Sequence, residues 1–379
     1  MGAYLDHAAT TPLRPEALAA MMPFLTERFG NPSGSHSVAR AARRAIDDAR
    51  DSMASLLGCR PGELVFTAGG TEADNLAVLG VAGHGRGDVV CSAVEHHAVL
   101  HAARAVGATT VPVDRDGVID LDALTAAVSQ HTALVSVMLA NNEVGTMQPV
   151  DAVVDLVRQR SAGARIHTDA VAGLPHLDVA SLAGRVDLVS ISAHKFGGPK
   201  GVGALVVRDT TALSPVFHGG GQERDRRPGT HDVAGIVGMA AALGAAMPQR
   251  HRELARLRGL RDRLVDGLVD AVADVTENGA SRLGPDDALS RLPGIANLAV
   301  AGVDNEELLI LLDEEGVQAS AGAACASGAA TPSHVLVAMG RSTAEARSAL
   351  RFSLGHSTTD ADVDRVLTVM PKVVERLRA

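Results

Sequence analysis

Short apolar runs alternate with amphipathic stretches through the middle of the chain. The runs that predict strands cover residues 65–67, 88–92, 109–113, 132–139, 165–168, 188–192 and 203–208. Between several of them, residues 120–129 and 151–160 have the spacing of amphipathic helices. This order predicts an α/β fold with a mostly parallel sheet and helices on both of its faces. Ligands of such sheets bind at the carboxyl ends of the strands.

The last third of the chain predicts a second, smaller unit. A helical region begins near Val233, and its run over residues 250–268 carries many Arg and Leu residues at helical spacing. The further apolar or helical segments lie at residues 296–301, 304–315 and 360–378. We therefore expect a large domain of residues 14–254 and a small α+β domain built from residues 1–13 and 255–379.

The composition narrows the class of protein. With 379 residues, of which 46% are hydrophobic, the chain can bury a core large enough for two domains. Aromatic residues make up only 2% and Trp is absent, so Ala, Val and Leu must fill that core. The net charge of −9 argues against a dedicated binder of nucleic acid or of acidic membranes. No apolar stretch reaches the length of a membrane span, and the start of the chain lacks the layout of a signal peptide.

The cysteines and histidines predict a reduced protein without a metal site. The chain has three widely spaced cysteines, Cys59, Cys91 and Cys325, and none forms a C-x-x-C motif. That usage fits a reducing cytoplasm without structural disulfides. His97 and His101 could share a helical face with Glu95 nearby, but no further motif supports zinc, so we expect no metal.

The lysine at position 195 carries the first candidate chemistry. The apolar run over residues 186–192 reads as a buried strand, and it leads through His194 to Lys195 and a glycine-rich turn at residues 197–201. A lysine in that place could form a Schiff base with pyridoxal phosphate. A lone lysine after a strand is more often a surface group, so the hypothesis depends on two further segments.

The first of these segments ends in an aspartate. Asp169 follows the apolar strand candidate at residues 165–168 and precedes Lys195 by a length that suits a crossover between parallel strands. Pyridoxal phosphate acts as an electron sink only while its ring nitrogen stays protonated, which requires a nearby carboxylate. Asp169 is a candidate for that counter-ion; a salt-bridged or strand-capping aspartate is the alternative.

The second segment is a candidate phosphate site. A short strand leads into Gly69, Gly70 and Thr71, and a helix-compatible stretch follows. Backbone N–H groups at such a turn and the helix N-terminus favour an anion, and Thr71 can add a hydroxyl. The segment is neither a Walker loop nor a G-x-G-x-x-G motif.

Together with these segments, a further group of motifs resembles the cysteine desulfurases, pyridoxal-phosphate enzymes of the class V aminotransferase type. The motifs lie at residues 4–11, 30–36, 95–99, 141–145, 219–224, 227–230 and 319–328. They occur in the family's order over nearly the whole chain. The cysteine segment, with residues 331–340 after it, is similar to the subgroup with a long cysteine loop. The resemblance implies an aspartate-aminotransferase-like fold, a homodimer and the conversion of L-cysteine to L-alanine, with the sulfur passed to a protein acceptor.

The resemblance also implies roles for individual residues. Lys195, His96 and Cys325 would be catalytic, with His96 stacked on the cofactor ring and Asp169 paired with its nitrogen. The residues implied to hold the cofactor are Gly70, Thr71, His96, Asn142, Asp169, Ser192, His194, Lys195 and, from the neighbouring subunit, Thr230. Arg351, Asn142 and Asn31 would contact the substrate, with Arg351 gripping its carboxylate.

Cys325 can be interpreted in two ways. Residues 321–330 are almost all small, and a buried structural cysteine among alanines is the plain alternative. Flanking glycines, the adjacent Ser327 and the following Pro332 favour a reactive thiol, which would attack the substrate sulfur as a thiolate. Cys59 and Cys91 have no such surroundings, and we expect them to be structural.

One position departs from the family pattern. Where the family usually has a glutamine that donates a hydrogen bond to the phenolic oxygen of the cofactor, this chain has Ala172. A selenocysteine lyase, another pyridoxal-phosphate lyase or a weakly active binding and assembly partner remain alternatives. Iron–sulfur assembly, thiolation of tRNA and a biosynthetic sulfur relay would all use the same motifs. Because the chain ends soon after its terminal helix, we do not expect it to dock an iron–sulfur scaffold through a C-terminal tail.

Overall fold

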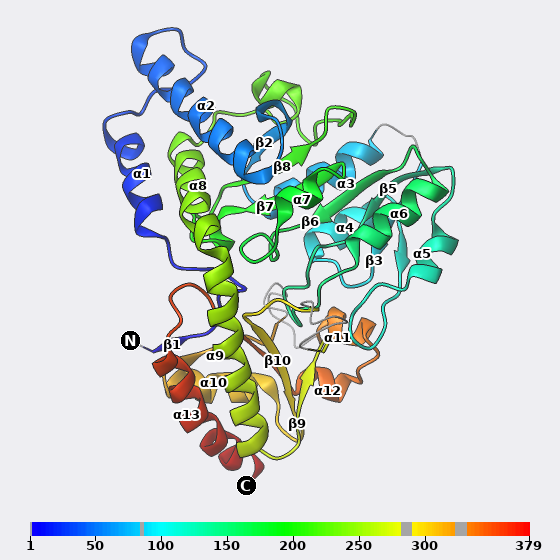
Figure 1. Cartoon of the computed structure of the whole chain (residues 1–379), viewed down its shortest axis with the longest axis vertical. Coiled ribbons are helices and arrows are strands. Elements are labelled where there is room, and N and C mark those ends of the chain that lie inside the picture. The colour runs from blue at the N-terminus through cyan, green and yellow to red at the C-terminus, as the bar shows by residue number, and fades with distance from the viewer. Residues whose placement is uncertain (1, 84–86, 282–289, 323–331) are drawn as a thin grey trace.

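A seven-stranded mixed sheet forms the centre of the larger part of the molecule (Figure 1). The computed structural model describes residues 2–83, 87–281, 290–322 and 332–379. In spatial order the strands are β2 (Leu64–Thr67), β8 (Gly203–Val207), β7 (Leu188–Ser192), β6 (Arg165–Asp169), β5 (Thr132–Ser136), β3 (Asp88–Ser92) and β4 (Thr109–Val111). β8 pairs antiparallel with both β2 and β7, and all other pairs of the sheet are parallel, so the predicted mostly parallel sheet is confirmed.

Helices cover both faces of this sheet. They are α1 (Pro15–Thr26), α2 (Ser37–Leu57), α3 (Gly70–Ala82), α4 (His97–Ala105), α5 (Leu121–Ala127), α6 (Val150–Arg160), α7 (Val179–Ala183) and α8 (Val233–Ala246), with the short 3₁₀ helices η1 (Pro61–Glu63), η2 (Ala193–Lys195) and η3 (Gln222–Asp225). Strands such as β5 and β7 are buried along their whole length, because each of their faces packs against helices.

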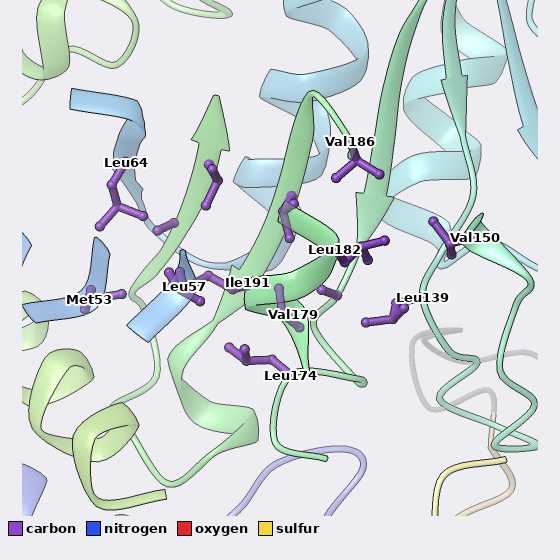
Figure 2. Close-up of a cluster of buried hydrophobic side chains, with 14 of the residues drawn as sticks. Met53, Leu57, Leu64, Leu139, Val150, Leu174, Val179, Leu182, Val186 and Ile191 are labelled. Carbon is purple, nitrogen blue, oxygen red and sulfur yellow. The ribbon is translucent and has the colours of Figure 1, made fainter. Parts of the chain in front are cut away.

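Two hydrophobic clusters fill the space between sheet and helices. Alternate residues of β2 separate onto them: Leu64 belongs to one cluster and Val65 to the other. Figure 2 shows part of the first cluster, in which Met53 and Leu57 of α2 pack with Ile191 of β7. The strand ends that carry the candidate chemistry are therefore held by a rigid core.

A smaller unit lies at the other end of the molecule and contains both chain termini (Figure 1). Its strands are β9 (Val275–Asn278), β10 (Ile295–Val300) and β12 (Ala349–Ser353), which form an antiparallel sheet, and β1 (Ala3–Tyr4) and β11 (Val317–Gln318), which pair in parallel. Its helices are α9 (Arg250–Ala271), α10 (Asn305–Glu314), α11 (His334–Ala338), α12 (Thr343–Arg347) and α13 (Asp360–Arg378). The helical region predicted from Val233 is divided at η4 (Met247–Gln249), which contains Pro248.

The small unit has its own hydrophobic cluster. That cluster joins Leu5 from the N-terminal segment to Leu260 of α9, Leu298 of β10 and Phe352 of β12. We propose that the two domains are residues 14–254 on one side and residues 1–13 with 255–379 on the other, since the clusters divide the chain near these positions. Within the described ranges, none of the helices combines the length and the apolar character that a membrane crossing requires.

Candidate active site

A cavity of about 350 Å³ opens at the carboxyl ends of the central strands. The predicted site residues that line it are Gly70, Thr71, His96, Asn142, Asp169, Ser192, His194, Lys195 and Arg351. They come from α3, the start of α4, the ends of β6 and β7, and β12 of the small unit. The site therefore lies where both units meet, as expected for ligands of sheets of this kind.

One corner of the cavity is built to hold an anion. The α3 helix starts at Gly70, and no side chain caps its first turn, so its N–H groups are available to a ligand. Gly69 has a φ of 142°, a conformation that only glycine adopts readily. A Cβ on Gly70 would come within 2.9 Å of the Val171 side chain, so glycine is also required there for space. Ser192 borders the same corner.

Residues 8–11 of the N-terminal segment form hydrogen bonds with His194 and Lys195. Lys195 ends η2, directly after β7, and its Nζ donates to the carbonyl oxygens of Ala8 and, at 3.1 Å, of Ala9. The backbone N–H and the hydroxyl of Thr11 both donate to the His194 carbonyl, at 3.0 and 2.8 Å. These bonds fix the turn so that the amine is delivered into the cavity.

Asp169 lies in the strand next to the one that leads to Lys195. Strands β6 and β7 are parallel neighbours, which confirms the crossover predicted from their spacing. Burial raises the pKa of Asp169 to about 6, while a hydrogen bond of 2.8 Å from the Val171 N–H and the charge of Lys195 act in the opposite direction. A buried carboxylate beside a lysine is a suitable partner for a cationic ring nitrogen.

His96 is held as a neutral imidazole. It caps the N-terminus of α4, where its Nδ1 accepts a hydrogen bond of 3.1 Å from the Ala98 N–H. Burial and the charge of Lys195 lower the pKa of His96 to about 4. The ring hydrogen is therefore on Nε2, since Nδ1 acts as an acceptor.

Arg351 is buried rather than part of a surface ion pair. Its exposed fraction is 1%, its Nη2 lies 2.7 Å from Asp6 Oδ1, and its Nη1 donates to the Asn142 carbonyl at 2.9 Å. Asp6 was not predicted as a site residue, although it lies within the motif at residues 4–11. The pair orients a guanidinium toward the cavity from β12, and the remaining N–H groups can bind an anion.

The structure does not bring every predicted residue to the cavity. Asn31 lies in an exposed turn, where its side chain accepts from the Ser33 N–H at 3.0 Å, and it does not line the cavity. Thr230 is also exposed and outside the cavity of its own chain. Cys325 falls within residues 323–331, outside the described residues, whereas Gly322 lines the cavity.

The other two cysteines are poor nucleophiles. Burial, followed by a nearby glutamate, raises the pKa of Cys59 to about 11 and the pKa of Cys91 to about 12. Both thiols therefore stay protonated near neutral pH. His97 and His101 stack at 5.0 Å between ring centroids, and no cluster in the described ranges has the ligands to hold a metal ion.

Sequence reasoning missed Asp74. It lies on α3 with an exposed fraction of 1% and lines the cavity. The sequence did carry a signal for it: Asp74 is a charged residue among the apolar residues Ala73 and Leu76 on the buried face of α3, and a buried charge is unusual.

These features fit pyridoxal phosphate. The uncapped helix start and its glycines suit the phosphate, Asp169 suits the ring nitrogen, and Lys195 supplies an amine for the aldehyde. The fold and the site together define the class of pyridoxal-phosphate enzymes whose active site lies between a large parallel-sheet domain and a small domain.

Comparison with known proteins identifies the family. The family model for aminotransferase class V matches residues 3–366. The chain is 46% identical to an IscS-like cysteine desulfurase of Mycobacterium tuberculosis, over 99% of this chain and 97% of the relative. A solved NifS-like protein has a TM-score of 0.91 and 33% identity, over 99% of this chain and 100% of that one. A structure described as SspA in complex with cysteine has a TM-score of 0.77 and 33% identity, over 93% and 98% of the two chains. The chain belongs to the class V aminotransferase family and, within it, to the cysteine desulfurases.

Proposed function

We propose that this chain is a pyridoxal-phosphate-dependent cysteine desulfurase that converts L-cysteine to L-alanine and places the sulfur on Cys325 as a persulfide. The observation that carries the proposal is one cavity bordered by a half-buried lysine, a buried carboxylate and a buried arginine: Lys195, Asp169 and Arg351. The relatives named as cysteine desulfurases and the related SspA structure in complex with cysteine support the choice of substrate.

The residues around the cavity divide into cofactor-binding and substrate-binding groups. Gly70, Thr71, Ser192 and His194 would hold the phosphate, and Asp169 the ring nitrogen. When bound, pyridoxal phosphate supplies an electron sink for negative charge that develops on the substrate carbon. His96 would cover the ring as a neutral imidazole, and Asn142 would face both cofactor and substrate.

Arg351 and Lys195 would act on the amino-acid part of the substrate. The guanidinium of Arg351 binds the carboxylate, because two parallel N–H groups match two carboxylate oxygens. Lys195 borders the same cavity, where its amine would remove the proton from Cα and return it later. Because Arg351 fixes the substrate next to Lys195, the transfer of the Cα proton becomes an intramolecular step.

The sulfur step requires a thiolate. The Cys325 thiolate attacks the sulfur of the substrate, an S–S bond forms and the Cβ–S bond breaks. The electron pair of the broken bond stays with the carbon skeleton, and the proton of the substrate thiol ends on Cβ, which gives alanine and a persulfide anion. A protein thiol of the acceptor then takes up the terminal sulfur by exchange.

We also infer that the enzyme is a homodimer in the cytoplasm. Apolar side chains of α1 and the following loop are exposed, with Leu25 at 59% and Phe29 at 77%, and a second copy would cover them. Thr230 is exposed outside its own cavity, which leaves it able to complete the phosphate site of the partner. A reducing compartment fits the free thiols of Cys59 and Cys91.

The test is the release of alanine and sulfide from L-cysteine in the presence of a reductant. Wild type is compared with Cys325→Ser, and Cys59→Ser serves as the matched control; all three proteins are loaded with pyridoxal phosphate. We expect Cys325→Ser to lose alanine formation and to carry no persulfide by mass spectrometry, while Cys59→Ser retains both. No turnover by loaded wild type, or full turnover by Cys325→Ser, would contradict the proposal.

A further inference from the structure

A buried carboxyl that the proposed mechanism does not use lies beside the cofactor cavity. Asp74 lines the cavity together with Asp169, and it belongs to the helix that presents the anion site. Its exposed fraction is 1%, and its Oδ1 has no hydrogen-bond partner among the residues that the structure describes. An ionised carboxylate is costly to bury without a counter-charge, so the protonation state of Asp74 needs a physical cause.

A hydrogen-bond network of three side chains, one from each of the neighbouring strands β5, β6 and β7, leads to Asp74. His167 Nδ1 lies 2.8 Å from Ser136 Oγ, and His167 Nε2 lies 2.9 Å from Ser190 Oγ and 3.6 Å from Asp74 Oδ1. Burial lowers the pKa of His167 to about 3, so the imidazole is neutral and carries one ring hydrogen. The Ser190 hydroxyl also hydrogen-bonds the Asp74 carboxyl, and this bond acts to lower the pKa of Asp74 against the larger raising effect of burial.

One arrangement of the hydrogens in this network leaves a proton of Asp74 free for another partner. In it, Ser190 donates to Asp74, the Ser190 Oγ accepts from His167 Nε2, and His167 Nδ1 accepts from Ser136. Every member is satisfied in this arrangement, as buried polar networks require. Asp74 Oδ1, 3.6 Å from His167 Nε2, has no hydrogen-bond partner among the described residues and can therefore carry the proton.

The surroundings of the two carboxyls decide which of them holds a proton. Asp169 receives the Val171 N–H at 2.8 Å and lies near the charge of Lys195, which both favour its ionised form. Burial, and to a lesser extent the negative charges of Asp169 and Glu95, raise the pKa of Asp74 and so favour its protonated form. Two carboxyls in one buried space do not both ionise, so the one in the more favourable environment carries the charge and the other keeps its proton.

We propose that Asp74 is a positioning residue: it keeps a proton beside Asp169 and donates it in a hydrogen bond to the Asp169 carboxylate. The cofactor nitrogen then faces one negative charge, held in a fixed orientation, instead of two that repel each other. The chain of Ser136, His167 and Ser190 keeps the Asp74 carboxyl turned for this bond. The inference deepens the proposed function, because it depends on pyridoxal phosphate binding in this cavity.

The test uses two readouts that need no L-cysteine. Infrared spectra of the folded apoprotein at pH 7 detect the C=O band of a protonated carboxyl, and equilibrium titration measures the dissociation constant of pyridoxal phosphate. The variants are Asp74→Asn, an isosteric donor that cannot ionise, and Asp74→Ala, which has no donor. Glu95→Gln removes the other buried carboxyl near Asp169 and serves as the spectral control.

We expect the infrared spectrum of wild type to contain a carboxylic-acid band with one component from Asp74. That component should be missing in Asp74→Asn and present in Glu95→Gln. Asp74→Asn should bind pyridoxal phosphate within about threefold of wild type, because its amide replaces the donor, whereas Asp74→Ala should bind about tenfold or more weakly. The absence of that component in wild type, or an equal loss of affinity in both Asp74 variants, would overturn the inference. A failed sulfur-transfer assay would leave both readouts unaffected, so the two proposals can fail separately.

Discussion

The replacement of Arg351 by lysine tests the substrate site most directly. Arg351 is 1% exposed, and two of its N–H groups are engaged, one with Asp6 Oδ1 at 2.7 Å and one with the Asn142 carbonyl at 2.9 Å. A guanidinium has five N–H donors, so it can hold both partners and still bind a carboxylate. The single ammonium of a lysine keeps the charge but cannot reproduce this geometry.

The size of the effect follows from the bonds that are lost. A hydrogen bond to a charged group contributes about 1.5–3 kcal/mol, and the lysine loses at least one such bond to the substrate carboxylate. We therefore expect Arg351→Lys to lower kcat/KM for L-cysteine by about 10- to 100-fold, mainly through KM. Asp6→Asn leaves the arginine in place and keeps a neutral acceptor, so its effect should be about tenfold or less.

The assay is steady-state alanine formation over a range of L-cysteine concentrations, with the affinity for pyridoxal phosphate measured separately. Arg50→Lys is the matched control, because Arg50 is another largely buried arginine, paired with Glu223 outside the cavity. It should lower stability without raising KM. A kcat/KM for Arg351→Lys within threefold of wild type would refute the proposed role of Arg351.

Three further predictions follow from the electrostatics of the described residues. The raised pKa of Asp169, about 6, means that its charged form is lost as pH falls, so the affinity for pyridoxal phosphate should fall below pH 6, and Asp169→Asn should remove this dependence. Burial opposes the ionisation of Glu223, but hydrogen bonds from His231 and Arg50 outweigh it and lower its pKa to about 2; its stabilising effect is thus present at neutral pH and is lost in acid. Glu223→Ala should reduce the free energy of unfolding by about 3–5 kcal/mol in urea at pH 7, and a loss below about 1 kcal/mol would contradict this reasoning. Ala172→Gln should supply a donor to the phenolic oxygen and lower the pKa of the lysine–cofactor Schiff base by about one pH unit, which absorbance titration measures; an unchanged titration would show that the amide does not reach the cofactor.

Local sequence patterns were sufficient for most elements of the fold. The strand predicted at residues 188–192 and the helix predicted at residues 360–378 have the same bounds in the structure, as β7 and α13. A fully apolar run and an amphipathic stretch that begins at a capping box are strong local signals. The direction of β8 was not predicted, although the short connection from β7 is typical of an antiparallel neighbour.

The sequence by itself determined the alternation of strands and helices, the glycine turn at the start of α3, and the lysine and aspartate at the ends of neighbouring strands. These features depend on residue types at short spacing, so they can be read locally. Only the tertiary structure decided that Arg351 pairs with Asp6, 345 positions away, and that Asp74 faces the cavity beside Asp169. It also separated Asn31 from that cavity. Such contacts are set by the packing of the small unit and the helices against the sheet, and burial then determines the charge of each group.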